Sequence, residues 1–238
     1  ALILSVDTLW IGDYVRRGFD REWAQRVPEV APDRVLISAT HTHTAPTQVS
    51  WFAHEEEATE AGVLTPREYS DYLVGRLVEI AAEAWQARAP GWLGWGLGQA
   101  VVGLNRRACY RDGSAVMYGP TDDPLFMNLE GHENHGVDLL LAFDAQKVLT
   151  SVVVNVACPA QCTEGESFIS ADFWHETREE LRRRHGAGLH ILGQCGAAGD
   201  QSPHRMIDRR AEERMFRLNG WLPATGGDGR MAERPAIA

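Results

Sequence analysis

Short apolar runs and amphipathic stretches alternate along the first part of the chain. Residues 1–7 and 35–40 are apolar runs of the kind that form buried strands. Between them, Trp23 lies on the apolar side of a stretch that predicts a helix over residues 20–30, with Asp20 as its N-cap. The strand–helix–strand order predicts a βαβ unit and an α/β fold, a layered domain with a mixed β-sheet flanked by helices.

Two further stretches predict helices. Thr65 is a suitable N-cap, Pro66 follows at the first helical position and Glu68 completes a capping box. The apolar stripe that follows to residue 89 is expected to face the core. Asp172 precedes the second helix, residues 173–185, whose basic last turn complements the helix dipole.

Glycine-rich and β-branched runs predict strands in most of the remaining chain. The predicted strands are residues 92–102, 137–143, 149–157 and 189–192, and residues 110–118 contain a turn of hairpin type at 111–114. Residues 222–238 show no periodicity, which predicts a linker or disordered tail. One domain over residues 1–221 is therefore expected.

Composition narrows the classes of function. Of 238 residues, 44% are hydrophobic and 24% charged, so the chain can bury a sizeable core. A formal net charge of −10 argues against a nucleic-acid partner. The four cysteines are widely spread without a CxxC pair, which favours buried thiols over a disulfide framework. The chain begins inside a predicted strand without Met, so we expect it to be trimmed at its start.

Two histidines follow the second predicted strand. Residues i and i+2 of a strand point to the same face, so His41 and His43 should leave the strand side by side. They form a candidate metal-binding pair, or one ligand plus one general acid/base. A solvated strand end is the weaker alternative for His-x-His directly after a buried strand.

Four short motifs follow one another along the chain. They are SATHTHTAP at residues 38–46, Asn105-Arg106-Arg107, VNVACP at 154–159 followed by Ser170-Ala171-Asp172, and Gly199-Asp200-Gln201-Ser202-Pro203. In this order they resemble the catalytic domain of the neutral/alkaline non-lysosomal ceramidase family, and the chain looks like a divergent bacterial-type member. The resemblance extends from the first strand to Pro203.

The resemblance implies a zinc-dependent amidase that cleaves the N-acyl bond of ceramide. The expected substrate is therefore a small amphiphilic amide, which is compatible with contact with a membrane surface. By the same resemblance His41 is a zinc ligand, His43 polarises or transfers protons, and Arg106 lines the site. Ser202 matches the serine of the family's Gly-Asp-x-Ser-Pro motif. These residue types suit amide hydrolysis, because a fixed guanidinium such as Arg106 can stabilise the oxyanion and an imidazole such as His43 can transfer protons near neutral pH.

One zinc ligand of the family has no counterpart here. The family has a histidine just after the strand predicted at 149–157, and Pro159 stands at its place in this chain. The family's Glu and Tyr ligands have no matching motif either, which leads us to expect truncation at the other end of the chain as well. Local substitutes are Glu164, Asp172 and His175. A plain N-cap is an equal alternative for Asp172, and a packed residue of the first helical turn is the stronger alternative for His175.

The favoured hypothesis is a zinc-dependent hydrolase of an N-acyl amide, ceramidase-like. Its expected catalytic residues are His43, Arg106 and Ser202, and its metal ligands His41, His43, Asp172 and His175. A non-catalytic binding relative of the same fold and a metal-dependent hydrolase of another ester or amide are the alternatives. Family members are often secreted or periplasmic, but the chain shows no signal, so its location stays open.

Two of these residues have structural alternatives. An ion pair with Asp112 or Asp122 is the alternative for Arg106. A turn residue before Pro203 is the alternative for Ser202, and the sequence alone favours it. Trp10 is an aromatic candidate for an apolar pocket, together with residues 51 and 52, although scattered aromatics are more often core.

Overall fold

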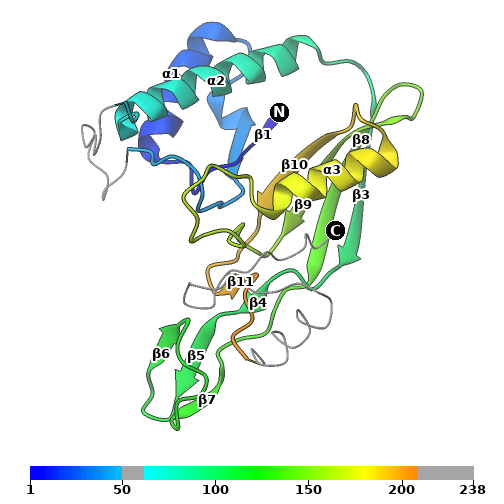
Figure 1. The fold of residues 1–238 in the computed structure, drawn as a ribbon. Coiled ribbons are helices and arrows are strands. Elements are labelled where there is room, and N and C mark those ends of the chain that lie inside the picture. The colour runs from blue at the N-terminus through cyan, green and yellow to red at the C-terminus, as the bar shows by residue number, and fades with distance from the viewer. Residues whose placement is uncertain (50–61, 208–238) are drawn as a thin grey trace.

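A computed structural model describes residues 1–49 and 62–207, and over these residues it shows three helices and a mixed set of strands (Figure 1). The elements in chain order are β1 (Leu2–Val6), α1 (Asp13–Arg26), a 3-10 turn (Pro32–Arg34), β2 (Val35–Ala39), α2 (Pro66–Gln86), β3 (Trp92–Gln99), β4 (Leu104–Asn105), β5 (Arg107–Tyr110), β6 (Ala115–Met117), β7 (Phe126–Leu129), β8 (Gly136–Phe143), β9 (Leu149–Val156), α3 (Phe173–His185), β10 (His190–Cys195) and β11 (Gln201–Ser202). The α/β class predicted from the sequence is confirmed. Residues 51 and 52 and the predicted tail lie outside the described residues.

The predicted βαβ unit is present. β1 and β2 pair in parallel, and α1 connects them. The prediction that this helix begins at Asp20 is wrong, because α1 begins at Asp13 and Asp20 lies within it, paired with Arg16. The earlier start buries Val15 and Phe19 completely in the core that α1 shares with α2 (Figure 1).

The start of α2 has the predicted capping box. The Thr65 hydroxyl accepts a hydrogen bond from the Glu68 backbone N–H, and the Glu68 carboxylate accepts one from the Thr65 N–H at 2.8 Å. Glu68 is exposed and Thr65 half-buried, so the box stabilises the helix end without contributing to the core.

Replacing Thr65 by Ala should lower the free energy of unfolding by about 1 kcal/mol, because an orphan N–H of the first turn loses its acceptor. Thr65→Ser is the matched control, since it keeps the oxygen. Chemical denaturation of both variants measures the difference, and equal stabilities would show that the box adds nothing here.

A four-stranded mixed sheet, in the order β10-β9-β8-β3, lies under α3. β9 and β10 are parallel, whereas β8 is antiparallel to both of its neighbours. Trp174 of α3 is 1% exposed and packs directly over Gly193 of β10, where a Cβ atom would lie only 2.5 Å from the indole ring. The close approach of α3 to the sheet therefore requires glycine at residue 193.

Hydrogen bonds place the βαβ unit beside this sheet. The Ser5 hydroxyl of β1 donates to the Gly193 carbonyl of β10 at 2.5 Å, and the Gln194 amide donates to the Ser38 hydroxyl of β2. Figure 1 shows β1 next to β10, so the carboxyl ends of β2, β9 and β10 meet in one region. That region contains the motifs singled out in the sequence.

The smaller strands extend away from the helices (Figure 1). β5 pairs with β6 across the predicted hairpin turn and with β7 on its other edge. The polar segment before β8 gave no strand signal, so β7 was not predicted; its pairing with β5 is a tertiary interaction. β4 and β11 form a two-stranded antiparallel pair that brings Asn105 opposite Gln201.

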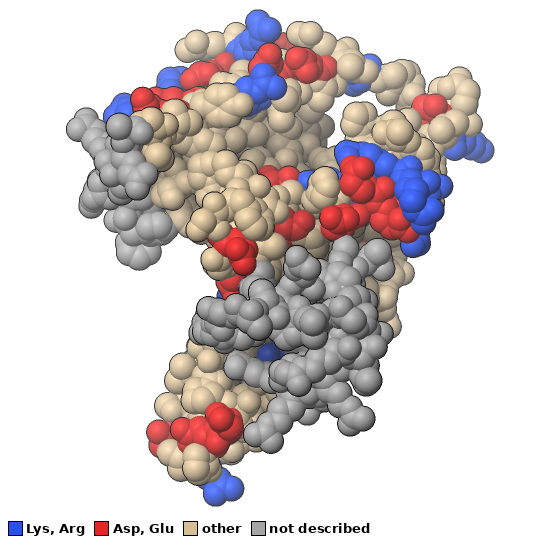
Figure 2. Space-filling view, in the orientation of Figure 1, with Lys and Arg blue, Asp and Glu red and all other residues tan. Residues whose placement is uncertain are grey.

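The outer face of α3 is charged. Figure 2 shows its arginine and glutamate side chains gathered together, and Glu180 forms ion pairs with Arg183 and Arg184. Hydrogen bonds from both arginines lower the Glu180 pKa to about 2.

Within the described residues no helix combines the length and the apolar character that crossing a membrane requires. No disulfide joins the four cysteines, all of which lie in the described part.

Candidate functional site

Four strand ends bring the sequence motifs together. His41 and His43 follow β2, Gln161 follows β9, Arg106 follows β4, and Ser202 lies in β11. The Ala160 N–H donates to the Thr40 carbonyl at 3.3 Å, which ties the loop after β9 to the end of β2. The site is therefore built from segments that are distant in sequence, since Thr40 and Ala160 lie 120 residues apart.

His41 and His43 lie in contact, but not through strand alternation as predicted. β2 ends at Ala39, and His41 adopts a left-handed backbone conformation with φ of 62°, which is uncommon for a residue other than glycine. The two imidazole rings meet edge to face with centroids 5.2 Å apart. Burial lowers the pKa of both histidines, and the neighbouring His43 lowers that of His41 further. Both are therefore neutral at pH 7.

Gln161 links His43 to Arg106. Its side chain is 2% exposed, with Nε2 at 2.9 Å from His43 Nε2 and Oε1 at 3.0 Å from Arg106 Nη1. The same Nε2 donates to Glu164 Oε2 at 2.8 Å. The backbone carbonyl of Gln161 is held by His204 Nε2 at 2.7 Å, so the whole residue is fixed.

The Arg106 guanidinium is 7% exposed and is held by neutral oxygen atoms. Nη2 donates to the Gly199 carbonyl at 2.9 Å, and Nη1 donates to the Tyr118 hydroxyl at 2.8 Å. The ion pair considered from the sequence is not formed with Asp112, whose carboxylate accepts instead from Ser114. No ion pair joins Arg106 to a carboxylate in residues 1–49 and 62–207. A buried guanidinium without a carboxylate partner is suited to stabilise negative charge that develops on a ligand.

Glu164 and His204 complete the polar cluster. One carboxylate oxygen of Glu164 lies 3.5 Å from His43 Nδ1 and the other lies 3.2 Å from His204 Nε2. Burial alone would raise the pKa of Glu164, but the hydrogen bond and charge of His204, with the charges of His43 and Arg106, lower it overall. From the sequence, Glu164 was predicted only as a substitute metal ligand, and His204 was not predicted as a site residue although it directly follows the Gly-Asp-x-Ser-Pro motif.

Ser202 is fully buried beside this cluster. Its hydroxyl oxygen accepts hydrogen bonds from the Tyr118 hydroxyl at 3.2 Å and from the His204 N–H at 3.1 Å. Tyr118 in turn contacts Arg106, so Ser202 joins the site through an intermediate residue. The geometry supports a role in fixing Tyr118 and His204.

The four predicted metal ligands are not brought together. The Asp172 carboxylate caps α3 and accepts hydrogen bonds from the Phe173, Cys162 and Thr163 N–H groups and the Thr163 hydroxyl, which occupies the lone pairs of both oxygens. His175 lies in the first turn of α3 and, together with Asp172, lines a cavity of about 640 Å³ under the helix.

The fit to zinc is therefore incomplete. His41 and His43 remain as a pair, and both nitrogens of His43 lie close to protein partners, Gln161 and Glu164. Among the described residues no group of three or more His, Cys, Asp or Glu side chains is arranged to hold a metal ion. The described residues therefore supply only part of a zinc site.

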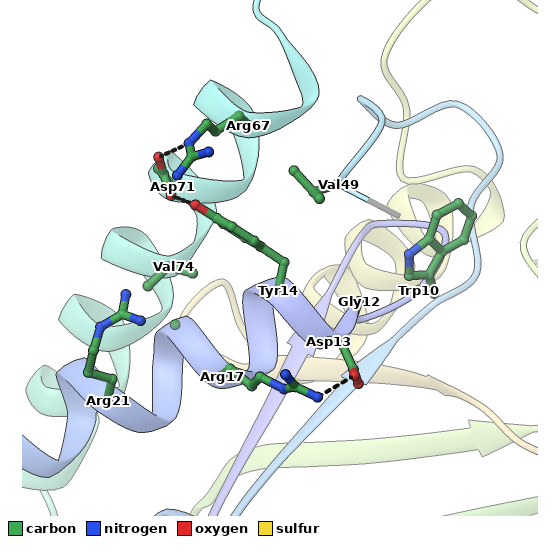
Figure 3. A pocket seen from close by; sticks show the side chains of 11 residues that line it. Trp10, Gly12, Asp13, Tyr14, Arg17, Arg21, Val49, Arg67, Asp71 and Val74 are labelled. Atoms are coloured by element: carbon green, nitrogen blue, oxygen red, sulfur yellow. Dashed lines mark hydrogen bonds and ion pairs between the residues drawn. The ribbon is translucent and has the colours of Figure 1, made fainter. Parts of the chain in front are cut away.

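A second, larger cavity, of about 900 Å³, lies between α1 and α2 (Figure 3). Trp10 lines it, as one of the aromatic residues considered for a pocket. Two ion pairs lie in its lining, Arg17 with Asp13 and Arg67 with Asp71, and the Tyr14 hydroxyl donates to Asp71. The cavity is separate from the histidine cluster and adds no residue to it.

Comparison with solved structures identifies similar folds. The chain aligns with the neutral ceramidase from Pseudomonas aeruginosa at a TM-score of 0.63 and 18% identity, over 87% of this chain and 32% of that protein. It aligns with a ceramidase complexed with C2 at a TM-score of 0.61 and 19% identity, over 84% of this chain and 30% of that protein. No protein-family model and no curated protein matches the sequence.

The chain thus spans about a third of the length of these ceramidases. Over the aligned residues the chain shares the fold of these ceramidases.

Proposed function

We propose that this chain, whose fold is that of part of the neutral ceramidases, belongs to a hydrolase of N-acyl amides with a ceramidase-like substrate. The observation that carries the proposal is the convergence of His43, Arg106 and Glu164 around one point, with a carboxamide between them. Lipid amides are the substrates that the names of the similar structures suggest. The apolar cavity under α3 offers room for an acyl chain.

Each residue has a role that follows from its geometry. The Arg106 guanidinium binds the substrate carbonyl oxygen and stabilises the oxyanion as the tetrahedral centre forms. His43 is neutral at pH 7, so it accepts a proton from the attacking water and returns it to the leaving amine. Glu164 accepts the Nδ1–H of His43 and stabilises the imidazolium that forms during this transfer. Tyr118 and Gly199 keep the guanidinium in place.

A panel of substrates tests the reaction class. The full-length protein, supplied with divalent metal ions, should hydrolyse N-acyl amides and leave phosphate esters intact. Hydrolysis of phosphate esters alone would favour a different metal hydrolase, and binding of amides without turnover would favour the non-catalytic relative.

Zinc dependence stays a prediction, with His41 as the ligand, since the roles above use the nitrogens of His43. Because the described residues hold only part of a zinc site, no step above is routed through a metal. Replacing His41 by Ala should remove bound zinc, since a site with few ligands tolerates no further loss. Elemental analysis measures this, with His190→Ala on β10 as control. Full zinc retention in His41→Ala would contradict the ligand assignment.

A further inference from the structure

β3 forms one edge of the four-stranded sheet. It pairs with β8 on one side, and among the described residues no strand pairs with its other side (Figure 1). Its eight residues include no proline and no charged side chain, which are two common means by which natural proteins block an exposed edge. The outer N–H and C=O groups of β3 are therefore available to another strand.

The two faces of β3 differ in character. The face on the side of α3 has only glycines along the strand, namely Gly94, Gly96 and Gly98. Their neighbours in β8, Val137 and Leu139, pack into the core beneath Trp174 of α3. This face of β3 is therefore flat, and all the large side chains between the glycines point to the other face.

The face of β3 away from α3 is apolar and exposed. Leu93, Trp95 and Leu97 lie on it, with 73%, 87% and 73% of their surfaces exposed. Leu140 of β8 lies directly opposite Trp95 and is half-buried, so the apolar surface continues onto the next strand. The three exposed side chains present roughly 500 Å² of apolar surface, a size typical of interaction sites.

The sequence of this stripe reads the same in both directions. Leu93-Gly94-Trp95-Gly96-Leu97 is symmetric about Trp95. If two copies of β3 pair antiparallel about this residue, each Trp95 lies opposite its counterpart, and Leu93 of one copy lies opposite Leu97 of the other. An interface between two copies related by a twofold axis requires this kind of self-complementarity.

Other registers lose the match. Residues that lie opposite each other in a sheet point to the same face. A shift by one residue sets Trp95 opposite a glycine and puts the apolar stripes of the two copies on opposite faces. A shift by two residues sets Leu93 opposite Gln99 and separates the two tryptophans. The register about Trp95 therefore joins both apolar stripes on one face and both glycine stripes on the other.

We propose that β3 is an interface with a second copy of this chain, formed by antiparallel pairing of the two β3 strands about Trp95. The two four-stranded sheets then continue into one. A stable dimer buries about 800 Å² on each partner, and the apolar stripe supplies more than half of that area before the paired main chains are counted. The proposed reaction at the histidine cluster has no part in this inference.

The charge of the chain favours a second copy over a lipid surface. Trp95 and its neighbours could also insert into a bilayer interface, but the formal net charge is −10, which repels the anionic lipids of a membrane. The symmetry of the stripe about Trp95, moreover, matters only for a partner that presents the same stripe.

Replacing Trp95 by Lys tests the interface. Sedimentation equilibrium of the full-length wild-type protein should give twice the mass of one chain. Trp95→Lys should raise the dissociation constant of the dimer by roughly 100-fold, because each dimer loses two central tryptophans and gains two like charges opposite each other. Trp95 is 87% exposed in the single copy, so the variant should keep the circular dichroism spectrum of the wild type.

Leu36→Lys is the matched control variant. Leu36 lies on β2 and is 54% exposed, so this change also places a lysine on an exposed apolar position of a strand. Because β2 is remote from the proposed interface, the variant should dimerise like the wild type.

A mixture of oppositely charged variants tests the register. Trp95→Lys and Trp95→Glu should each be monomeric alone, and an equimolar mixture should dimerise, because residue 95 of one copy faces residue 95 of the other. The double variant Leu93→Lys/Leu97→Glu should likewise dimerise more tightly than either of its single variants, since the opposite charges face each other across the interface.

A monomeric wild-type protein would overturn the inference. A dimer that persists in Trp95→Lys would also overturn it, since that dimer uses another surface, and so would equal weakening by Leu36→Lys. A wild-type monomer that binds phosphatidylcholine vesicles through Trp95 would assign this face to lipid instead. If the mixed Trp95 variants stay monomeric, the two copies of Trp95 do not face each other and the proposed pairing is wrong.

Discussion

Replacing Arg106 by Lys should lower kcat for an N-acyl amide by roughly 10²- to 10³-fold, with little change in KM. Lysine keeps the positive charge but loses the planar fork that contacts Gly199, Tyr118 and Gln161 together. If the guanidinium acts on charge that develops only in the transition state, its loss reduces kcat and kcat/KM alike.

Arg107→Lys is the matched control for this experiment. Arg107 is the next residue in the chain, but its side chain is 41% exposed and pairs with Glu130. Its replacement should change neither constant. A rise in KM alone for Arg106→Lys would show that Arg106 binds substrate without stabilising the transition state.

Replacing Gly193 by Ala should lower the free energy of unfolding by about 3 kcal/mol, near the upper end of overpacking effects. The new Cβ would lie 2.5 Å from the Trp174 ring, which is 1% exposed and cannot shift unless α3 moves with it. The measurement is denaturant unfolding of the variant and the wild-type protein.

Gly188→Ala provides the control for the packing effect. Gly188 precedes β10, and a Cβ there would meet nothing within 4 Å. Its stability should stay within about 0.5 kcal/mol of wild type. Equal stabilities of the two alanine variants would show that α3 does not press on the sheet at Gly193.

The sequence predicted elements whose signals are local. Helix α3 was predicted with the bounds that the structure shows, because Asp172 caps its start and a basic turn ends it. The start of α1 was misplaced because its N-cap, Gly12, offers no side-chain cap, whereas Asp20 looks like one. β7 was not predicted, because it is a strand only through its pairing with β5.

The site could be predicted only in part for a similar reason. The motifs pointed to His41, His43, Arg106 and Ser202, and the structure places all four in one region. Gln161 and His204 have no local signal, since their roles come from contacts with segments 118 and 43 residues away. Asp172 has a carboxylate, which is a common metal ligand, but its oxygen atoms accept hydrogen bonds from the backbone N–H groups of Cys162 and Thr163.

Hydrolysis of an N-acyl amide in ¹⁸O-labelled water tests the central claim most directly. The full-length protein, with divalent metal ions supplied, should release the carboxylic acid carrying one ¹⁸O atom per turnover together with the free amine, and Arg106→Lys should do so roughly 10²-fold more slowly. Absence of labelled acid from the wild-type protein, or equal rates for wild type and Arg106→Lys, would contradict the assignment of this site to amide hydrolysis.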